Sequence, residues 1–251
     1  MATVYNQLLN NLDELKLYGF KANIDDYCDL LARGEKTFID AFYEPSQKEK
    51  ELRKVRALNI AIRTAGFPYV RSLNDYDFSF QPSLKKEEIE DIFTLRFIER
   101  NENIILIGSP GTGKTHLATA LGIEAARNHY ATRFISCHQL MNELSKANKE
   151  NRLEYRLKHY LRYKVLIIDE LGYLNLDSSA ANIFFQLISM RYEKRATIFT
   201  SNKAISKWYE IFGEPIITNA ILDRVLHHSK VINIVGPSYR LKDIFLEEQN
   251  E

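Results

Sequence analysis

The chain has 251 residues and a formal net charge of +1, with 45% hydrophobic and 27% charged residues. This length and composition can bury one substantial core and a smaller second one, so we expect a soluble globular protein. Because positive and negative charges nearly balance, overall basicity does not indicate a nucleic-acid partner, and any such partner must be inferred from where the charges lie.

Two cysteines, Cys28 and Cys137, lie far apart and have no metal-binding or redox spacing. A reduced, cytoplasmic protein is the simplest interpretation. No apolar run approaches the length of a membrane span, and the first residues carry acids where a signal peptide would need a basic and then an apolar stretch. We therefore expect a cytoplasmic chain without a membrane partner.

The first 65 residues have a helical pattern. Leu8, Leu12 and Leu15 recur at helical spacing, and strand-like alternation is absent from residues 3 to 65. Residues 1–47 hold four Lys and Arg against eight Asp and Glu, whereas residues 48–71 hold seven against two. The pattern predicts a helical N-terminal domain over 1–65. Residues 66–84, rich in turn formers and containing two prolines, then form a linker.

From Asn103 onward, short apolar runs alternate with longer helical stretches. The predicted strands are residues 103–108, 132–137, 164–169, 196–201 and 231–235. Their nearly continuous Val, Ile and Leu content is typical of strands covered on both faces, as in a parallel sheet between helices. Residues 85–251 are therefore predicted to form a three-layer α/β domain with a five-stranded parallel sheet.

A glycine-rich segment follows the first predicted strand and opens a helix. The segment consists of Gly108, Ser109, Pro110, Gly111, Thr112, Gly113, Lys114 and Thr115, and His116 follows it. Glycines there let backbone N–H groups turn toward a phosphate at the positive end of a helix. Lys114 then reaches the β- and γ-phosphates, and the Thr115 hydroxyl binds Mg²⁺. This strand–loop–helix context predicts a P-loop that binds ATP, rather than a glycine-rich turn that binds nothing.

Two further polar sites end predicted strands. Asp169 and Glu170 follow an apolar strand, so Asp169 can hold magnesium through its water shell and Glu170 can orient and deprotonate the attacking water. Asn202, at the end of the next strand, can reach between the γ-phosphate and that water. The alternatives are acids that cap a loop and an ordinary turn-forming amide.

The order GSPGTGKTH, VLIIDE and TSN resembles the AAA+ ATPases. The segments DFSFQPSL and LRFIERNENIILIGSPGTGKTHLATALG closely resemble the IstB-type helper ATPases of insertion sequences, relatives of the DnaC and DnaI helicase loaders and of the DnaA initiator. The resemblance spans nearly the whole chain. It implies a homo-oligomeric, ATP-dependent assembly on duplex DNA that works with a cognate transposase. A helicase loader is the alternative, and a metabolic P-loop kinase is disfavoured because no second substrate pocket is evident.

The same resemblance gives roles to two arginines. Arg224, in the segment ILDRV, resembles the arginine finger that contacts the γ-phosphate held by a neighbouring subunit, and Arg240 resembles the second sensor, facing the subunit's own nucleotide. Either could instead be an ordinary solvated or salt-bridged arginine. The last predicted strand ends at residue 235, too near residue 251 for a separate helical lid, and lidless sites are typical of the IstB and DnaC group.

Between the second and third strands, residues 138–162 offer two helices where one would suffice, resembling an insertion of the DnaA and DnaC group. Basic residues gather there, and the candidate contacts to DNA phosphates are Lys149, Arg152, Arg156, Lys158 and Arg162. A solvated helix face is the alternative. The basic stretch 48–56 could also contact DNA, or it could pack on a neighbouring subunit or the transposase.

Overall fold

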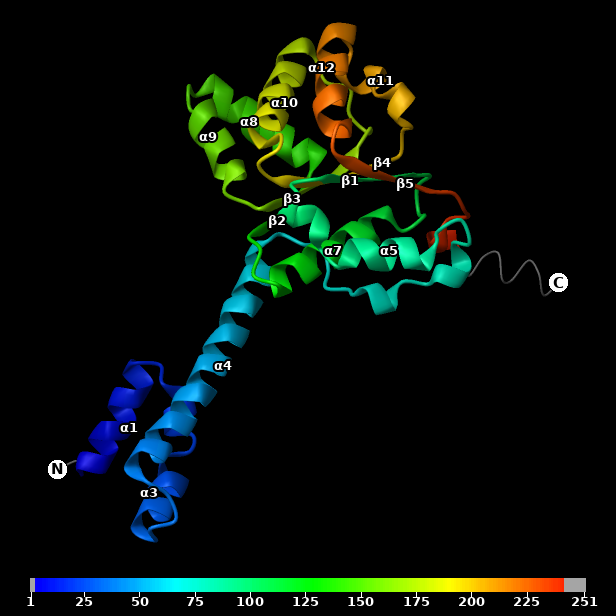
Figure 1. Ribbon diagram of the computed structural model, residues 1–251. Coiled ribbons are helices and arrows are strands. Elements are labelled where there is room, and N and C mark those ends of the chain that lie inside the picture. Colours follow the sequence, from blue (N-terminus) through cyan, green and yellow to red (C-terminus); the bar gives the residue numbers. More distant parts are fainter. Residues whose placement is uncertain (1–2, 242–251) are drawn as a thin grey trace. The chain divides into compact units, whose positions relative to one another are not determined.

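We describe residues 3–241 of a computed structural model of the chain, which divides into two compact units, Met1–Ile60 and Ala61–Glu251 (Figure 1). Helix α4 begins in the first unit and ends in the second. The predicted limits of the helical domain (1–65), linker (66–84) and ATPase domain (85–251) stay predictions, because compactness alone does not establish where a domain begins.

The first unit is helical. Its helices are α1 (Val4–Glu14), α2 (Tyr18–Lys21), α3 (Ile24–Ala32) and the first part of α4 (Phe38–Thr64). The Thr3 side chain caps α1 by accepting a hydrogen bond from the backbone N–H of Asn6. Two aspartates in the first turn of α3 stabilise that helix, because their negative charge lies at the positive end of the helix dipole.

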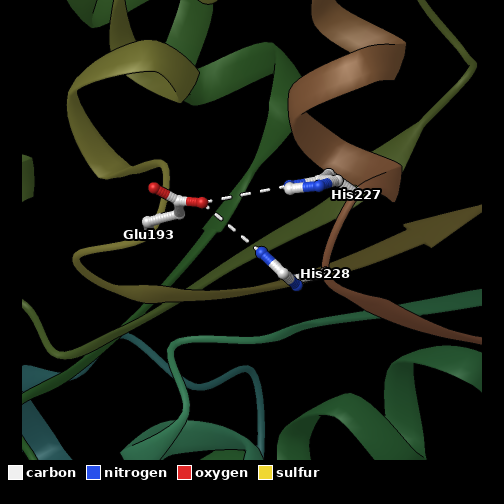
Figure 2. Close-up of side chains that lie close together, drawn as sticks. All are labelled: Glu193, His227 and His228. Carbon is white, nitrogen blue, oxygen red and sulfur yellow. Dashed lines mark ion pairs between the residues drawn. The ribbon is translucent and has the colours of Figure 1, made fainter.

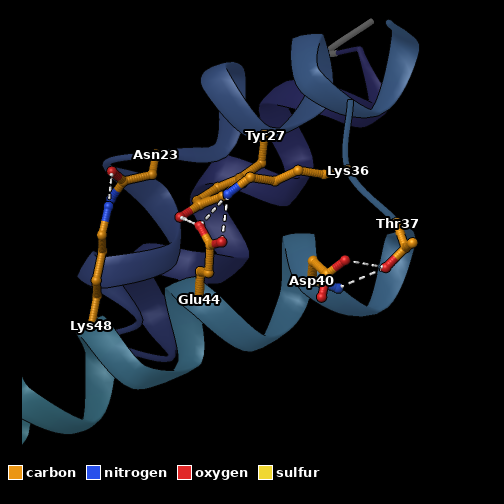
Figure 3. A network of polar contacts seen from close by, with 7 residues as sticks. All are labelled: Asn23, Tyr27, Lys36, Thr37, Asp40, Glu44 and Lys48. Carbon is orange, nitrogen blue, oxygen red and sulfur yellow. Dashed lines mark hydrogen bonds and ion pairs between the residues drawn. The ribbon is translucent and has the colours of Figure 1, made fainter. Parts of the chain in front are cut away.

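Polar side chains join α3 to α4 in this unit (Figure 3). The Glu44 carboxylate, on α4, accepts a hydrogen bond of 2.8 Å from the Tyr27 hydroxyl and pairs with Lys36 at 2.5 Å. One turn further along α4, Lys48 Nζ donates to Asn23 Oδ1 at 2.8 Å. These contacts hold α3 and the loop after it against α4.

The second unit contains the remaining elements. Its helices are α5 (Lys86–Phe93), α6 (Arg96–Glu99), α7 (Lys114–Arg127), α8 (Cys137–Lys149), α9 (Leu153–Leu161), α10 (Ser178–Arg191), α11 (Tyr209–Phe212) and α12 (Pro215–Leu226). Short 3-10 helices are η1 (Leu73–Asp75), η2 (Phe78–Phe80), η3 (Ile205–Lys207) and η4 (Tyr239–Leu241). The strands are β1 (Asn103–Gly108), β2 (Thr132–Ser136), β3 (Val165–Leu171), β4 (Ala196–Ser201) and β5 (Ser229–Ile234).

The strands form a five-stranded sheet in the order β2-β3-β4-β1-β5, and every neighbouring pair is parallel. Helices cover both faces: α5 and α7 lie on one, and α8 to α12 on the other (Figure 1). The order places β4 between β1 and β3, so three loops that are distant in sequence leave the same edge of the sheet side by side. The predicted three-layer α/β fold with a five-stranded parallel sheet is confirmed.

Alternating strand residues build the two cores. Ile105 and Ile168 pack among α8 to α12, whereas Ile104 and Ile167 pack toward α5 and α7. All four are at most 1% exposed, which explains why the strands read as continuous apolar runs. The sheet thus lies between two apolar layers, one on each face.

After β5, the described chain continues to η4. The expected absence of a lid also concerns residues 242–251, which lie outside the described residues. In the described range 3–241, no helix combines the length and apolar character needed to cross a membrane.

Candidate functional site

The glycine-rich loop joins β1 to α7 at the carboxyl edge of the sheet. Gly111 and Gly113 have φ of 81° and 93°, a left-handed conformation that glycine adopts without steric cost. Lys114 begins α7, and its Nζ donates a hydrogen bond of 2.7 Å to the carbonyl oxygen of Ser109. The Thr112 hydroxyl donates to the same carbonyl at 2.8 Å. The loop therefore closes on itself at the start of a helix, where an anion is favoured.

The carboxylate of Asp169, near the end of β3, accepts hydrogen bonds from hydroxyl groups on two other elements. Thr115 Oγ1 donates to Asp169 Oδ1 at 3.0 Å, and Thr200 Oγ1, from β4, donates to the same oxygen at 2.5 Å. Thr200 Oγ1 also accepts a hydrogen bond of 2.9 Å from the backbone N–H of Glu170. One hydroxyl thus contacts the Asp169 carboxylate and the backbone of Glu170.

Glu170 departs from regular strand geometry. Its φ is 62°, which is rare for a residue with a side chain, and the register between β3 and β4 shifts between Ile168 and Leu171. Asp169 is only 6% exposed, whereas Glu170 is exposed and lines the cavity beside the P-loop. Local strain of this kind concentrates at functional sites, and here it gives two adjacent acids different environments.

Asn202 follows β4 and also lines the cavity. Its Oδ1 is buried and has no hydrogen-bond partner among residues 3–241. A Cβ added to Gly172, whose φ is 130°, would lie 2.4 Å from this oxygen, so the chain passes it closely. Because an unpaired buried polar atom is costly, this amide fits a site that receives a polar ligand.

The cavity over the P-loop has a volume of about 370 Å³. Its walls are formed by Tyr69, Arg71, Asp75, Tyr76, Asp77, Gln81, residues 110–116, Glu170, Tyr173, Asn202, Tyr239 and Arg240. The structure therefore brings together most of the P-loop with Glu170, Asn202 and Arg240. Gly108, Ser109, Asp169 and Arg224 do not line the cavity. Ser109 and Asp169 are hydrogen-bonded to residues that do, Lys114 and Thr115.

One wall comes from the segment before the sheet. The Tyr76 hydroxyl donates to the carbonyl oxygen of Thr112 at 3.1 Å, and a Cβ on Gly113 would lie 2.6 Å from the Tyr76 ring. His116 Nε2 lies 3.1 Å from the carbonyl oxygen of Ser72. From the sequence, residues 66–84 are expected to form a linker in which Tyr76 is a packing anchor rather than a stacking partner for the adenine ring; the structure places this segment in the wall of the site. The aromatic residues within a turn-rich stretch were the available signal.

The segment after β5 forms another wall. The backbone N–H of Tyr239 donates to the carbonyl oxygen of Gly111 at 2.9 Å, and the buried Gln81 side chain donates to the carbonyl oxygen of Pro237 at 2.9 Å. Arg240, next to Tyr239, is exposed and lines the cavity. The position of Arg240 suits contact with a nucleotide held by the same chain.

Burial shifts the pKa values of several groups at the site. Burial lowers the pKa of Lys114, while the nearby Asp169 carboxylate acts in the opposite direction. Burial raises the pKa of Asp169, and hydrogen bonds from Thr200 and Thr115 oppose that rise. Burial lowers the pKa of His116 and raises that of Tyr76 to about 12. Both side chains are therefore uncharged at neutral pH.

Arg224 lies on α12 and is half-buried. Its guanidinium stands 4.7 Å from the centre of the Phe185 ring, and Nη1 donates to the carbonyl oxygen of Ala220 at 3.0 Å. These contacts to a ring and a backbone carbonyl hold the side chain in place without neutralising its charge.

The structure separates the five candidate DNA contacts into two groups. Arg156 pairs with Glu143 of α8 and stands 5.3 Å from the centre of the Tyr160 ring, so its guanidinium joins α9 to α8. Lys149, Arg152, Lys158 and Arg162 are exposed. Arg152 and Arg162 cap α9 instead of lying within it, because the helix begins at Leu153 and ends at Leu161.

Arg152 and Lys158 have acidic neighbours of their own. Arg152 pairs with Glu150, and Lys158 pairs with Glu154 at 2.6 Å. Exposed ion pairs of this kind contribute little and exchange readily for other partners. Four exposed cations thus remain available to an anionic surface along α8 and α9.

The residues present fit a nucleotide. The P-loop glycines have the required left-handed backbone, Lys114 lies inside the loop, and Asn202 lines the same cavity. With the strand order β2-β3-β4-β1-β5, these features define a P-loop nucleotide-binding module of the AAA+ class.

The chain belongs to the family of IstB-like ATP binding proteins, which it matches over residues 10–246. It is 46% identical over 250 residues to the ATP-binding protein of insertion sequence IS232 from Bacillus thuringiensis subsp. berliner, covering 100% of both chains. It is 40% identical to the ATP-binding protein of insertion sequence IS21 from Pseudomonas aeruginosa, covering 92% of this chain and 88% of that protein. The expected IstB family is confirmed.

Solved structures support the fold. DnaI matches with a TM-score of 0.54 at 24% identity, over 66% of this chain and 89% of DnaI. DnaA from Aquifex aeolicus, bound to AMPPCP, matches with a TM-score of 0.53 at 19% identity, over 71% of this chain and 55% of DnaA. At these identities the likeness concerns the fold alone.

Proposed function

We propose that this chain hydrolyses Mg-ATP and that, with ATP bound, several copies assemble on duplex DNA to assist a partner transposase in moving an insertion sequence. The observation that carries the proposal is the Asp169 carboxylate, which accepts hydrogen bonds from the hydroxyls of Thr115 and Thr200, while the Thr200 hydroxyl also accepts one from the backbone N–H of Glu170. The chain that holds this arrangement belongs to an insertion-sequence family.

The two acids have separate roles in the proposed reaction. The Thr115 hydroxyl and the buried Asp169 carboxylate would hold Mg²⁺, the latter through a water. Mg²⁺ neutralises charge on the phosphates when bound. Glu170, exposed on the cavity wall, would orient and deprotonate the attacking water. Asn202 would bridge that water and the γ-phosphate, and Lys114 would contact the β- and γ-phosphates.

The position of Arg224 suggests that ATP hydrolysis depends on the assembly of several subunits. Arg224 does not line the cavity of its own chain, yet its charge is not neutralised by the contacts that hold it. An arginine held in this way on α12 suits the γ-phosphate of a neighbouring subunit. We therefore propose a homo-oligomer with ATP sites shared between subunits, in which Arg240 contacts the nucleotide of its own subunit.

A replicative helicase loader is the second candidate, because DnaI has the same fold. Sequence identity favours the transposition helper: the insertion-sequence relatives are 40–46% identical over nearly full length, against 24% for DnaI. The two candidates differ in partner. The purified protein, with ATP and DNA, should bind a cognate transposase, and binding to the host replicative helicase instead would support the loader.

DNA binding is proposed through the exposed cations of α8 and α9, without base readout. With ATP, affinity for unrelated duplexes of equal length should be similar, and log K should fall with log salt by about 0.9 per phosphate contact. Replacing Arg152 and Arg162 by Ala should reduce that slope by up to about two per bound subunit. Arg100→Ala with Arg127→Ala, two exposed arginines elsewhere, is the matched control.

If the variant at Arg152 and Arg162 keeps both its affinity and its salt slope, these helices form a solvated face. The basic stretch 48–56 would then be the next DNA site to test. A loss of ATP binding by the free variant would instead indicate damage to the fold.

A further inference from the structure

Three exposed side chains, Glu193, His227 and His228, meet on the second unit (Figure 2). Glu193 lies between α10 and β4, and the two histidines lie between α12 and β5. They gather where β4 and β5 begin, whereas the P-loop leaves the carboxyl end of β1. Because the sheet is parallel, this cluster and the nucleotide site lie at opposite edges.

The spacing of the three groups suits one small cation. Glu193 Oε1 lies 3.4 Å from His228 Nε2 and 3.9 Å from His227 Nδ1. One ligand atom from each residue can be chosen so that all lie within 4.8 Å of one another. Two ligands of a tetrahedral zinc ion, each about 2.0 Å from the metal, are about 3.3 Å apart. Side-chain rotations alone could close the remaining difference.

Hydrogen bonds from Asn101 and Asn103, at the start of β1, hold the backbone that carries these ligands. Asn101 Nδ2 donates to the carbonyl oxygen of Glu193 at 3.1 Å, and the backbone N–H of Asn103 donates to the carbonyl oxygen of His228 at 2.7 Å. The turn after α10 and the turn after α12 are therefore both hydrogen-bonded to residues 101–103. Binding a metal here would need little ordering of the chain.

A neighbouring hydroxyl contacts one of the two histidines. The Tyr192 hydroxyl lies 2.6 Å from His227 Nδ1. The same nitrogen faces Glu193 at 3.9 Å, so a metal ion that binds Nδ1 would displace this hydrogen bond, and Tyr192 competes with the ion for His227. Glu193 itself has a φ of 56°, so the turn after α10 holds a rare backbone conformation at a ligand position.

We propose that Glu193, His227 and His228 form a binding site for a zinc-like transition metal ion, with water in the fourth position. Two imidazoles and one carboxylate suit Zn²⁺, Ni²⁺ or Cu²⁺, whereas Mg²⁺ prefers oxygen ligands and would not fill the site. The ion would join the turn after α10 to the end of α12, the helix that carries Arg224. The alternative is a histidine–carboxylate ion pair that binds no metal.

Titration of the full-length, chelator-treated protein with Co²⁺, followed by Zn²⁺ competition, tests the site. The visible absorption of tetrahedral Co²⁺ should appear at one equivalent and disappear when Zn²⁺ is added. His228→Ala and Glu193→Gln should each weaken Zn²⁺ binding by about 100-fold or more, because each removes a ligand. Tyr192→Phe, which removes the competing hydroxyl, should not weaken it. His138→Ala, an exposed histidine on α8, should bind as the unchanged protein does.

Either of two results would overturn the site. One is the absence of the tetrahedral absorption from the unchanged protein. The other is equal Zn²⁺ affinity in the unchanged protein, His228→Ala and Glu193→Gln. Because all three side chains are exposed, the variants should keep their circular dichroism spectra. Glu193→Gln preserves size, so it decides the matter if an alanine variant were to lose its fold.

Discussion

Thr200→Val removes one hydroxyl that contacts the carboxylate of Asp169, the proposed magnesium ligand, and the backbone of Glu170, the proposed general base. Thr200 Oγ1 donates to Asp169 Oδ1 at 2.5 Å and accepts from the backbone N–H of Glu170 at 2.9 Å. The side chain is 1% exposed, and valine has nearly the same shape and the same preference for strands. The variant should therefore fold while leaving Asp169 and the Glu170 backbone without this partner.

The expected loss follows from the charge of the acceptor. A hydrogen bond to a charged group contributes roughly 1.5–3 kcal/mol. If about 2 kcal/mol of this is felt in the transition state, kcat should fall about 30-fold. Affinity for nucleotide without magnesium should change much less, because Thr200 does not line the cavity.

The pH dependence supplies a second, independent signature. Burial raises the pKa of Asp169, and the Thr200 hydrogen bond opposes that rise. The charged carboxylate is the form that serves magnesium, so activity is present above this pKa and is lost as pH falls through it. Removing the hydroxyl should raise the pKa further and move the acid limb of the rate profile to higher pH.

Steady-state ATPase assays across this pH range, with Thr200→Ser as the matched control, check the argument. The serine variant keeps the hydroxyl and should stay within about threefold of the unchanged protein, a difference of under 1 kcal/mol. Circular dichroism should show that both variants fold. Equal turnover and the same acid limb in the valine and serine variants would refute the positioning role of Thr200.

Three further outcomes are expected. Lys114→Ala should abolish binding of a fluorescent ATP analogue while the fold is kept, because Lys114 supplies the side-chain cation within the loop, and unchanged affinity would end the P-loop assignment. Glu170→Gln should bind Mg-ATP but lose about 10²- to 10⁴-fold in turnover, and wild-type turnover would exclude a general base at Glu170. Arg224→Ala should bind nucleotide and hydrolyse it slowly, and mixing it with Lys114→Ala should partly restore activity because each variant keeps a different half of a shared site. No recovery in proven mixed oligomers would contradict that sharing.

The sequence by itself determined those features that depend on neighbouring residues. Glycines, Lys114 and Thr115 between a strand and a helix define the P-loop, because the phosphate-binding geometry is built from consecutive residues. Continuous apolar runs located the strands, since strands buried on both faces lose the alternation of a half-exposed sheet. Asp169 and Glu170 are adjacent residues at the end of such an apolar run, so the sequence alone also predicted them as site residues.

Only the tertiary structure decided what depends on the order of the strands. With β4 between β1 and β3, the Thr200 hydroxyl lies beside Asp169, although the two residues are 31 positions apart. Tyr76 reaches Thr112 across 36 positions and turns a predicted linker into a wall of the site. The ion pair with Glu143 joins Arg156 to α8. Such contacts depend on how helices cross between strands, and local sequence patterns do not encode those crossings.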